Sequence, residues 1–233
     1  MRLNIKLQTD RFPLSYRMMM VSFIKEALKL SDVAYFQQIY HSSKANRPFS
    51  FGIYVHDYEL NETEFHIKGY VGLTVTSPDT QFMLHFYNGL MQMNDFKYKK
   101  FNLKRLKVQM INSTNIDRNH VYFKTLAPLL IRDKKAKPIL IHEEGFEKEL
   151  NYISNAVLKD FRGYGLIQPL IFTSKNMKKV VVKEKIHSDD ETLFFTGYQG
   201  IFALQGDMED LKVLSEIGLG FRSSQGFGAV EVV

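Results

Sequence analysis

The feature that most constrains the fold is the order in which two hydrophobic periodicities alternate along the first half of the chain. Apolar residues at every second position are typical of strands half-buried in a sheet, and apolar residues three or four positions apart are typical of helices. These patterns predict a strand, a helix, a second short helix, two strands, a helix and a strand. The predicted ranges are 2–8, 13–29, 32–40, 49–55, 64–76, 78–91 and 96–110.

The second half repeats this order more loosely. Strands are predicted at 121–126, 137–141, 166–173, 178–186, 194–206 and 227–233, and helices at 143–161 and 208–217. Lys175-Asn176 is predicted to be a turn between two of these strands. The segment 112–119 is polar and rich in turn formers, so we expect one domain over residues 1–114 and a second over 115–233.

A strand–helix–strand–strand–helix–strand order is the ferredoxin-like arrangement, which RNA-recognition modules share. We therefore predict an α+β fold of two tandem ferredoxin-like βαββαβ domains, each an antiparallel sheet with helices on one face. The length of 233 residues suits two such domains, and 45% hydrophobic residues supply their cores and exclude a disordered chain.

The residues that are missing exclude several kinds of chemistry. Because cysteine is absent, the chain has no disulfide, no thiol nucleophile and no cysteine-ligated metal. Its seven histidines include no pair at metal-site spacing, so we expect neither a metal nor another cofactor. The first residues alternate like a strand, and no apolar run is long enough to span a membrane, which predicts a cytoplasmic protein without a membrane partner.

The net charge of +6 is unevenly distributed, since residues 1–116 hold 15 Lys and Arg against 9 Asp and Glu. Much of this excess lies in 96–107, which has no acid and carries Lys97, Lys99, Lys100, Lys104, Arg105 and Lys107. These cations alternate with apolar residues and could line one face of a strand that binds a polyanion. Lysines that only protect an edge strand from aggregation would give the same pattern.

Four glycines fall within eleven residues near the C-terminus, at Gly218, Gly220, Gly226 and Gly228. Such a segment can expose backbone N–H groups to phosphate oxygens, or it can be a structural turn between a helix and a strand. It is not a dinucleotide fingerprint, because Ser223 stands where the third glycine would be, and it is not a Walker loop, because Phe227 stands where the Walker lysine would be.

The spacing of these glycines (Gly-Leu-Gly, five residues, Gly-Phe-Gly, just before a last strand) resembles the glycine-rich loop of the CRISPR repeat-processing endoribonucleases of the RAMP superfamily. Further similarity spans the chain. It includes the opening strand at 1–7, the stretch 125–131, in which Ala127 replaces the usual serine, and the strand and helix at 198–217 that lead into the loop.

This resemblance implies metal-independent cleavage of precursor CRISPR RNA within its repeats. The ribose 2′-hydroxyl attacks the adjacent phosphate and leaves a 2′,3′-cyclic phosphate and a 5′-hydroxyl. Such a reaction needs a base, an acid and cations that stabilise the phosphorane. Two alternatives remain open: a non-catalytic RAMP subunit that binds crRNA in an effector complex, and a general RNA-binding protein. The resemblance also leaves open a homodimer and association with other effector subunits.

Candidate catalytic residues follow from the same resemblance. His41 occupies the place of the family's histidine after the short second helix, where the helix dipole favours a protonated imidazole. Lys25 stands where the family often has a tyrosine, with Tyr16 as a second candidate for that role. Lys44 and Arg47 are candidates for stabilising the phosphorane charge.

RNA-binding residues are expected in two groups. The first is the basic group in the first half: Arg2, Lys97, Lys99, Lys100, Lys104 and Arg105. The second is the glycine-rich loop: Gly218, Gly220, Arg222, Ser223, Gly226, Phe227 and Gly228.

Overall fold

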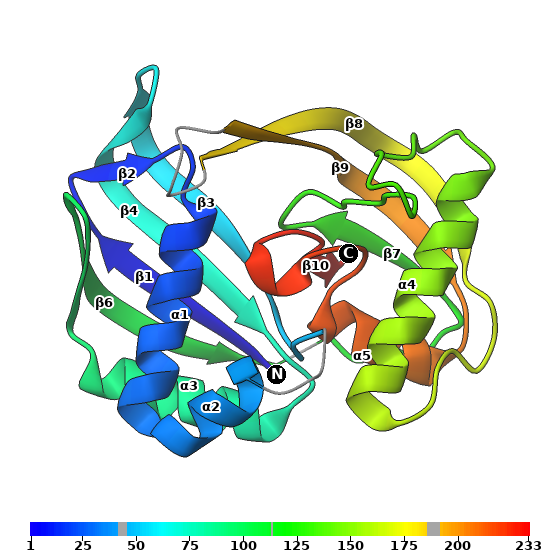
Figure 1. Ribbon diagram of the computed structural model, residues 1–233, viewed down its shortest axis with the longest axis horizontal. Coiled ribbons are helices and arrows are strands. Elements are labelled where there is room, and N and C mark those ends of the chain that lie inside the picture. Colours follow the sequence, from blue (N-terminus) through cyan, green and yellow to red (C-terminus); the bar gives the residue numbers. More distant parts are fainter. Residues whose placement is uncertain (42–45, 113, 186–191) are drawn as a thin grey trace.

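The computed structural model describes residues 1–41, 46–112, 114–185 and 192–233. Within these residues the chain forms a six-stranded sheet from its first half and a four-stranded sheet from its second half. The two sheets lie side by side in Figure 1. The boundary between residues 114 and 115 remains a prediction.

The first sheet is antiparallel throughout. Its four main strands are ordered β6-β1-β4-β3, with the short strands β2 and β5 added at its edges. Their bounds are β1 (Arg2–Gln8), β2 (Arg11–Pro13), β3 (Ser50–Leu60), β4 (Glu64–Thr76), β5 (Asp95–Tyr98) and β6 (Phe101–Ile111). In β1 the alternation predicted from sequence buries Leu3, Ile5 and Leu7 on one face.

The second sheet is ordered β10-β7-β9-β8. Its strands are β7 (His120–Thr125), β8 (Ile171–Lys185), β9 (Thr192–Gln205) and β10 (Val230–Val232). In both sheets the last strand of the repeat pairs with one side of the first strand, and the third strand pairs with its other side. This shared order confirms the prediction of two ferredoxin-like units.

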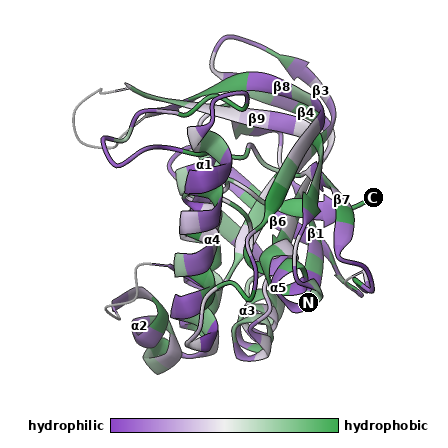
Figure 2. Cartoon of the chain, turned by 90° about the vertical axis from the view of Figure 1, so that its right-hand side faces the viewer, coloured by the Kyte–Doolittle hydropathy of each residue, from purple (hydrophilic) through white to green (hydrophobic). Residues whose placement is uncertain are grey.

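Helices cover one face of each sheet. They are α1 (Arg17–Ser31), α2 (Val33–His41), α3 (Thr80–Gln92), α4 (Gly145–Arg162) and α5 (Met208–Ile217), followed by the short 3-10 helix η1 (Ser223–Gln225). Figure 2 shows α1 and α4 on one side of the molecule, with β1, β6 and β7 on the other. Among the described residues, no helix is both long and apolar enough to cross a membrane.

The prediction of one strand over 96–110 is wrong. The chain turns back at Lys99, which has a φ of 52°, so that β5 and β6 form a hairpin. Lysine gives no signal for such a turn, because the left-handed region is normally occupied by Gly, Asn or Asp. The basic residues therefore lie on two strands and their turn, and do not form one row.

Two predictions in the second half are also wrong. Residues 137–141 form no strand, and only an isolated bridge pairs Arg132 with Pro138. The predicted turn at Lys175-Asn176 lies inside the continuous strand β8, as a register shift between Ser174 and Asn176. In β4 the apolar pattern of the sequence changes phase near Gly69, which predicts a bulge there. The register shift between β3 and β4 does fall beside Gly69.

The starts of α1 and α3 differ from those that the sequence predicts, whereas the start of α5 agrees. Pro13 belongs to β2, and α1 begins only at Arg17. The Ser77-Pro78 pair in the sequence predicts Ser77 as the N-cap of α3. The N-cap is instead Asp79, whose side chain accepts a hydrogen bond from the Phe82 N–H. Asp207 directly precedes the helix expected at 208–217, so the sequence predicts it as the N-cap. It does cap α5, accepting hydrogen bonds from the N–H groups of Glu209 and Asp210.

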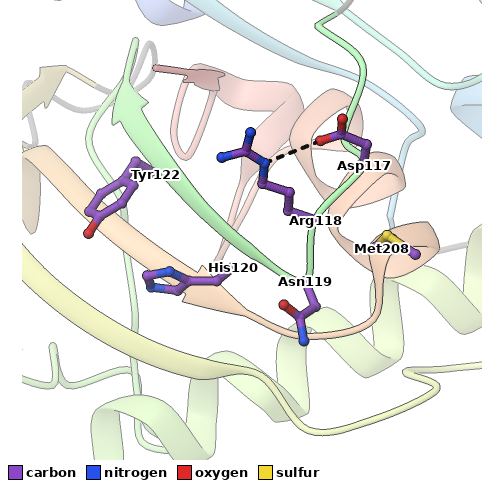
Figure 3. A pocket seen from close by; sticks show the side chains of 6 residues that line it. All are labelled: Asp117, Arg118, Asn119, His120, Tyr122 and Met208. Carbon is purple, nitrogen blue, oxygen red and sulfur yellow. Dashed lines mark ion pairs between the residues drawn. The ribbon is translucent and has the colours of Figure 1, made fainter.

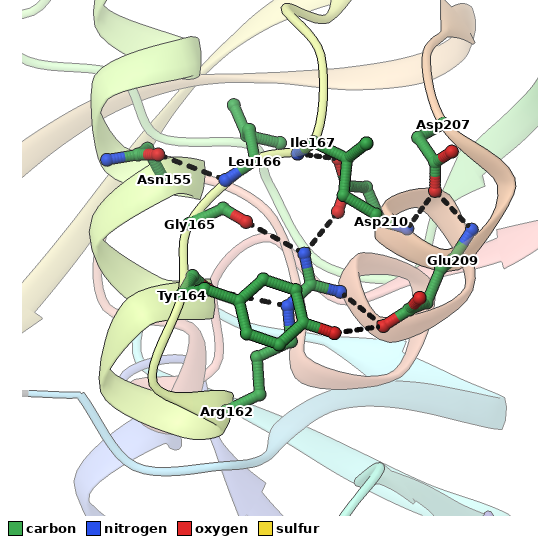
Figure 4. Close-up of polar contacts among 9 residues, drawn as sticks. All are labelled: Asn155, Arg162, Tyr164, Gly165, Leu166, Ile167, Asp207, Glu209 and Asp210. Atoms are coloured by element: carbon green, nitrogen blue, oxygen red, sulfur yellow. Dashed lines mark hydrogen bonds and ion pairs between the residues drawn. The ribbon is translucent and has the colours of Figure 1, made fainter.

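A network around Arg162 fastens the end of α4 to the start of α5 (Figure 4). Its guanidinium donates to Asp210, which is fully buried, and to Glu209 at 3.1 Å. The Tyr164 hydroxyl donates to the same Glu209 carboxylate at 2.6 Å, and the Ile167 N–H donates to Asp210 at 2.7 Å. Because each buried charge has a partner, the network is a structural one.

Candidate active site

Lys25 and Arg47 meet at the ring of Tyr40. The Lys25 ammonium lies 4.8 Å from the ring centre, and the Arg47 guanidinium lies 4.5 Å from it. Lys25 comes from α1 and Tyr40 from α2, while Arg47 lies in the segment between α2 and β3. Two of the cations predicted from sequence are thus brought together by an aromatic residue that the sequence analysis did not select.

The electrostatics of this cluster favour an anion. Among the described residues no carboxylate pairs with Lys25 or Arg47. Burial, together with the nearby charges of Arg47 and Lys29, lowers the pKa of Lys25 below its ordinary value. An added negative charge would relieve this repulsion, so the cluster is suited to a phosphate group.

Tyr40 also offers a hydrogen-bond donor. Its hydroxyl is buried and has no partner within the described part of the chain, and the same holds for the Nε atom of Arg47. Burial raises the pKa of Tyr40, so the phenol remains protonated in neutral solution. The cluster therefore contains two buried polar atoms able to donate to a ligand.

His41 is the last residue of α2, next to Tyr40, and its side chain is exposed. Its ring meets the edge of the Phe36 ring at 6.2 Å. The sequence predicts that this helix ends at residue 40, just before His41, whereas α2 includes His41 as its last residue. Lys44, the other candidate in this segment, falls outside the described residues.

The cluster borders a cleft between the two halves of the molecule. Arg47 lines a cavity of about 220 Å³, together with residues of α2 and α4. Beside it, the Asn46 side-chain amide donates to the Asp160 carboxylate of α4 at 2.7 Å. A ligand bound at Arg47 would therefore lie within reach of both halves.

Tyr16 lies outside this cluster. It precedes α1, where its ring stacks on Phe12 at 5.5 Å and burial raises its pKa. The neighbouring Arg17 guanidinium lies 4.9 Å from its ring centre. Of the five catalytic candidates, the described geometry brings together Lys25 and Arg47, places His41 on the same helix as Tyr40, and separates Tyr16 from them.

The glycine-rich loop, residues 218–228, packs between the two halves. A Cβ atom at Gly226 would lie 2.9 Å from the Phe51 ring of β3, and one at Gly218 would lie 2.8 Å from Ser50. Both glycines also have φ values in the left-handed region, 82° and 93°. Any other residue type at these two positions would be strained by the left-handed φ and would have to displace Ser50 or the Phe51 ring.

Most of the loop's backbone is already hydrogen bonded within the protein. The Leu219 N–H donates to Gly228 O, the Phe221 N–H to Leu130 O and the Gly228 N–H to Pro128 O. Gly220, Gly226, Phe227 and Gly228 are buried, whereas Arg222 is exposed and Ser223 half-buried. This geometry favours the structural alternative for the glycines and leaves the Arg222 tip accessible.

Arg17, which the sequence analysis did not select, fastens this loop to α1. Its Nε atom donates to Gly226 O at 3.0 Å, and its Nη1 atom donates to Glu184 of β8 at 2.9 Å. The guanidinium also lies 4.6 Å from the centre of the Phe227 ring. Both charged side chains are buried, so this ion pair connects the two halves inside the protein.

Apart from Arg2, the predicted basic group lies on the β5–β6 hairpin, at the outer edge of the first sheet in Figure 1. Lys100 pairs with Glu64 at 2.8 Å, and Arg105 donates to Met93 O at 3.1 Å. Of this group, Lys97, Lys99 and Lys104 are exposed and have no ion pair among the described residues. Because β5 is an edge strand, protection from aggregation remains a second explanation for these lysines.

Arg2 is used within the fold. Its guanidinium donates to Val230 O at 2.9 Å and lies 3.7 Å from the Glu231 carboxylate. Burial lowers the pKa of Arg2 despite these acidic neighbours. Arg2 therefore joins β1 to β10. Because its charge is partly neutralised by Glu231, it is less suited than a free arginine to bind an anionic ligand.

A wider hollow of about 640 Å³ lies at the start of β7, lined by Asp117, Arg118, Asn119, His120, Tyr122 and Met208 (Figure 3). It is open, and its only ion pair joins two strongly exposed side chains, Arg118 and Asp117, at 3.7 Å. None of the predicted site residues lines it. In the described ranges, no three His, Asp or Glu side chains are grouped so that they could hold a metal.

Comparison with known proteins identifies the family. The model of the C-terminal part of the CRISPR-associated protein Cas6 matches residues 110–232, more than half of the chain. A search of the curated proteins found no match.

Solved structures of other proteins have a similar fold over the whole length of this chain. A protein described as Cas6-related, from Pyrococcus furiosus, has a TM-score of 0.86 at 20% identity, covering 100% of this chain and 98% of that one. An RAMP protein described as binding different RNA substrates has a TM-score of 0.85 at 18% identity, covering 100% and 99%. The product complex of a Thermus thermophilus Cas6 gives 0.68 at 13% identity, covering 100% and 99%. At these identities the structures establish the fold, and the match of the family model carries the assignment: the chain belongs to the Cas6 family of CRISPR-associated proteins.

Proposed function

We propose that this chain binds CRISPR repeat RNA and cleaves the precursor into crRNA units without a metal ion. The observation that carries the proposal is the cluster of Lys25 and Arg47 around Tyr40, two cations without an acidic partner among the described residues, beside His41 in a Cas6-family chain. Cas6 proteins of this fold are described in complex with a product and with a substrate mimic, and an RAMP protein of this fold is described as binding RNA substrates, which supports RNA as the ligand.

The proposed reaction is an attack of the ribose 2′-oxygen on the adjacent phosphorus atom. The bond from phosphorus to the 5′-oxygen of the next nucleotide breaks, which leaves a 2′,3′-cyclic phosphate and a 5′-hydroxyl. A base removes the proton of the 2′-hydroxyl, and an acid protonates the departing 5′-oxygen. His41 is proposed for one of these transfers, because an imidazole can accept or donate a proton near neutral pH.

Lys25, Arg47 and Tyr40 are proposed to stabilise the negative charge that develops on the phosphate. The ammonium of Lys25 and the guanidinium of Arg47 stabilise the phosphorane oxygens, which carry more negative charge in the transition state than in the ground state. The Tyr40 hydroxyl donates a hydrogen bond to the same phosphate. Since these donors are held by packing before RNA binds, little reorganisation accompanies the reaction.

The test is single-turnover cleavage of RNA containing CRISPR repeats, with and without EDTA. We expect the same rate in both, one cleavage position, and products with a cyclic phosphate and a 5′-hydroxyl. A matched RNA with a 2′-deoxynucleotide before the scissile phosphate should bind equally well and remain uncut. Loss of cleavage in EDTA contradicts the mechanism. Tight binding without any cleavage favours the non-catalytic crRNA-binding subunit.

A further inference from the structure

Two arginines from different segments of the second half contact the same phenylalanine ring. The guanidinium of Arg132, which follows β7, lies 4.7 Å from the centre of the Phe195 ring. The guanidinium of Arg222, in the glycine-rich loop, lies 4.9 Å from it. Phe195 belongs to β9, is 2% exposed, and packs with Leu130 and Phe227, so the ring is a fixed platform.

Neither arginine has an acidic partner within the described residues. The carboxylate of Asp133, which is next in sequence to Arg132, instead accepts the N–H groups of Lys135 and Lys137 at 2.8 Å. The Nε atom of Arg132 is buried and has no hydrogen-bond partner in the part of the chain that the structure describes. Burial, and then the charge of Arg222, lowers the pKa of Arg132.

The backbone at Arg222 adds an independent observation. Its φ of 62° lies in the left-handed region, where a residue other than Gly, Asn or Asp is uncommon. Strain of this kind persists only where the surroundings hold the residue in place, and it is concentrated at ligand-binding positions. The protein therefore keeps a strained arginine next to a second arginine, an arrangement that is unfavourable until an anion is bound.

We infer that Arg132 and Arg222 form a clamp on the Phe195 ring for one backbone phosphate of single-stranded RNA. The forked guanidinium matches the oxygens of a phosphodiester. Two guanidinium groups carry two positive charges, one more than is needed to neutralise a single phosphate, and the second also attracts the neighbouring phosphates. The choice of RNA as the source of the phosphate rests on the proposed function.

The clamp is distinct from the Lys25–Tyr40–Arg47 cluster. Phe227 packs against Phe195 and meets Arg17 at the start of α1, whereas Lys25 lies eight residues further along that helix, about 12 Å at 1.5 Å per residue. The clamp would hold RNA without touching the reacting atoms. Its loss should therefore weaken RNA binding.

The test uses Arg132→Gln, Arg222→Gly and the double variant, with an uncleavable 2′-deoxy RNA. Glycine at 222 removes the guanidinium and relieves the left-handed strain, so the melting temperature should stay the same or rise. We expect each single variant to bind RNA about 10-fold more weakly, as for loss of a charge-assisted hydrogen bond. Since both arginines hold one phosphate, the salt slope of the double variant should fall by only about 0.7.

Arg118→Gln is the matched control, because Arg118 is exposed, lies in the same half and carries the same charge. It should leave affinity and salt slope unchanged. A double variant that binds RNA with wild-type affinity and slope overturns the clamp. So does a lowered melting temperature with unchanged affinity, which would show a purely structural role.

A second arm separates failure of the clamp from failure of the proposed function. If the wild-type chain binds no RNA, the proposed function is wrong, and inorganic phosphate then probes the site directly. Phosphate should raise the melting temperature of the wild type more than that of the double variant. An equal response of the two proteins overturns the clamp.

Discussion

At the scale of single residues, the chemistry proposed for this Cas6-family chain depends on a few polar side chains that have no ionic or hydrogen-bond partner in the described structure. Lys25 and Arg47 have no acidic neighbour in the described structure, and the Tyr40 hydroxyl between them has no hydrogen-bond partner there. A buried donor without a partner costs about 1–3 kcal/mol of stability. Its retention beside two cations is explained if a substrate oxygen completes the set.

The first prediction concerns His41. His41→Ala should lower the single-turnover cleavage rate by roughly 10²–10⁴-fold, the usual effect of losing a positioned acid or base. Affinity for repeat RNA should change little, because this side chain is exposed and lies at the end of α2. His142→Ala, which removes another exposed histidine, is the control. Wild-type cleavage by the His41 variant would move the proton transfer to another group.

The second prediction separates the ring of Tyr40 from its hydroxyl. Tyr40→Phe keeps the surface that Lys25 and Arg47 contact and removes only the donor, so cleavage should slow by about 10-fold or more. Because the hydroxyl has no partner in the described protein, the free energy of unfolding should stay the same or rise. A stability loss with unchanged cleavage would show that the hydroxyl is structural.

At the scale of elements, the sequence predicts those whose signals are local. The alternation in β1 and β4 and the Asp207 cap of α5 need no partner to be recognised. The β5–β6 turn was missed because lysine occupies its left-handed position. The residues of the β8 bulge have the composition of a turn. Only their pairing with β9, where Gly200 has a φ of 138°, shows that they form a bulge within one strand.

The candidate site divides in the same way. The family resemblance selects His41 and Arg47 by their distance from the end of α2 and from the start of β3, which can be counted in the sequence, and their catalytic roles stay predictions. Tyr40 resembles an ordinary apolar-face residue of α2, and its contact with Lys25 depends on how α1 and α2 pack. Arg17 and Glu184 are 167 positions apart, so no local signal announces their ion pair.

The third prediction tests that ion pair. Arg17→Met leaves Glu184 buried without its partner and should lower the free energy of unfolding by about 3–5 kcal/mol at neutral pH. Exchanging both residues for methionine should recover most of this loss. Denaturant unfolding of the single and double variants measures both values.

The pH dependence of the Arg17→Met defect has a definite sign. Burial raises the pKa of Glu184 in the folded protein, and Arg17 opposes that effect. Without Arg17 the folded state favours the protonated carboxyl more strongly. The defect should therefore be smallest near the ordinary glutamate pKa of about 4.3 and should grow as pH rises through the folded pKa. A defect of equal size at all pH values would exclude Glu184 as its cause.

For the whole molecule, the fourth prediction asks whether the hairpin lysines bind RNA. Exchanging Lys97, Lys99 and Lys104 together for glutamine should weaken RNA binding and reduce the salt slope by up to about 0.7 for each lost phosphate contact. An unchanged slope would show that these lysines only protect the edge strand β5.

The control for this triple variant carries the same change in charge. Exchanging the exposed Lys148, Lys159 and Lys178 for glutamine alters the second half and leaves the hairpin intact. An equal loss of slope in both triple variants would indicate a general effect of net charge and would contradict a specific hairpin contact.

The glycine-rich loop also determines how the protein should melt. The two halves have separate hydrophobic cores, but Gly218 and Gly226 pack directly against Ser50 and Phe51, and Arg17 holds the loop from α1. Neither core can open without exposing the surface on which the other depends. Differential scanning calorimetry should therefore give one endotherm whose calorimetric and van't Hoff enthalpies agree, and two separate endotherms would show that the loop does not couple the halves.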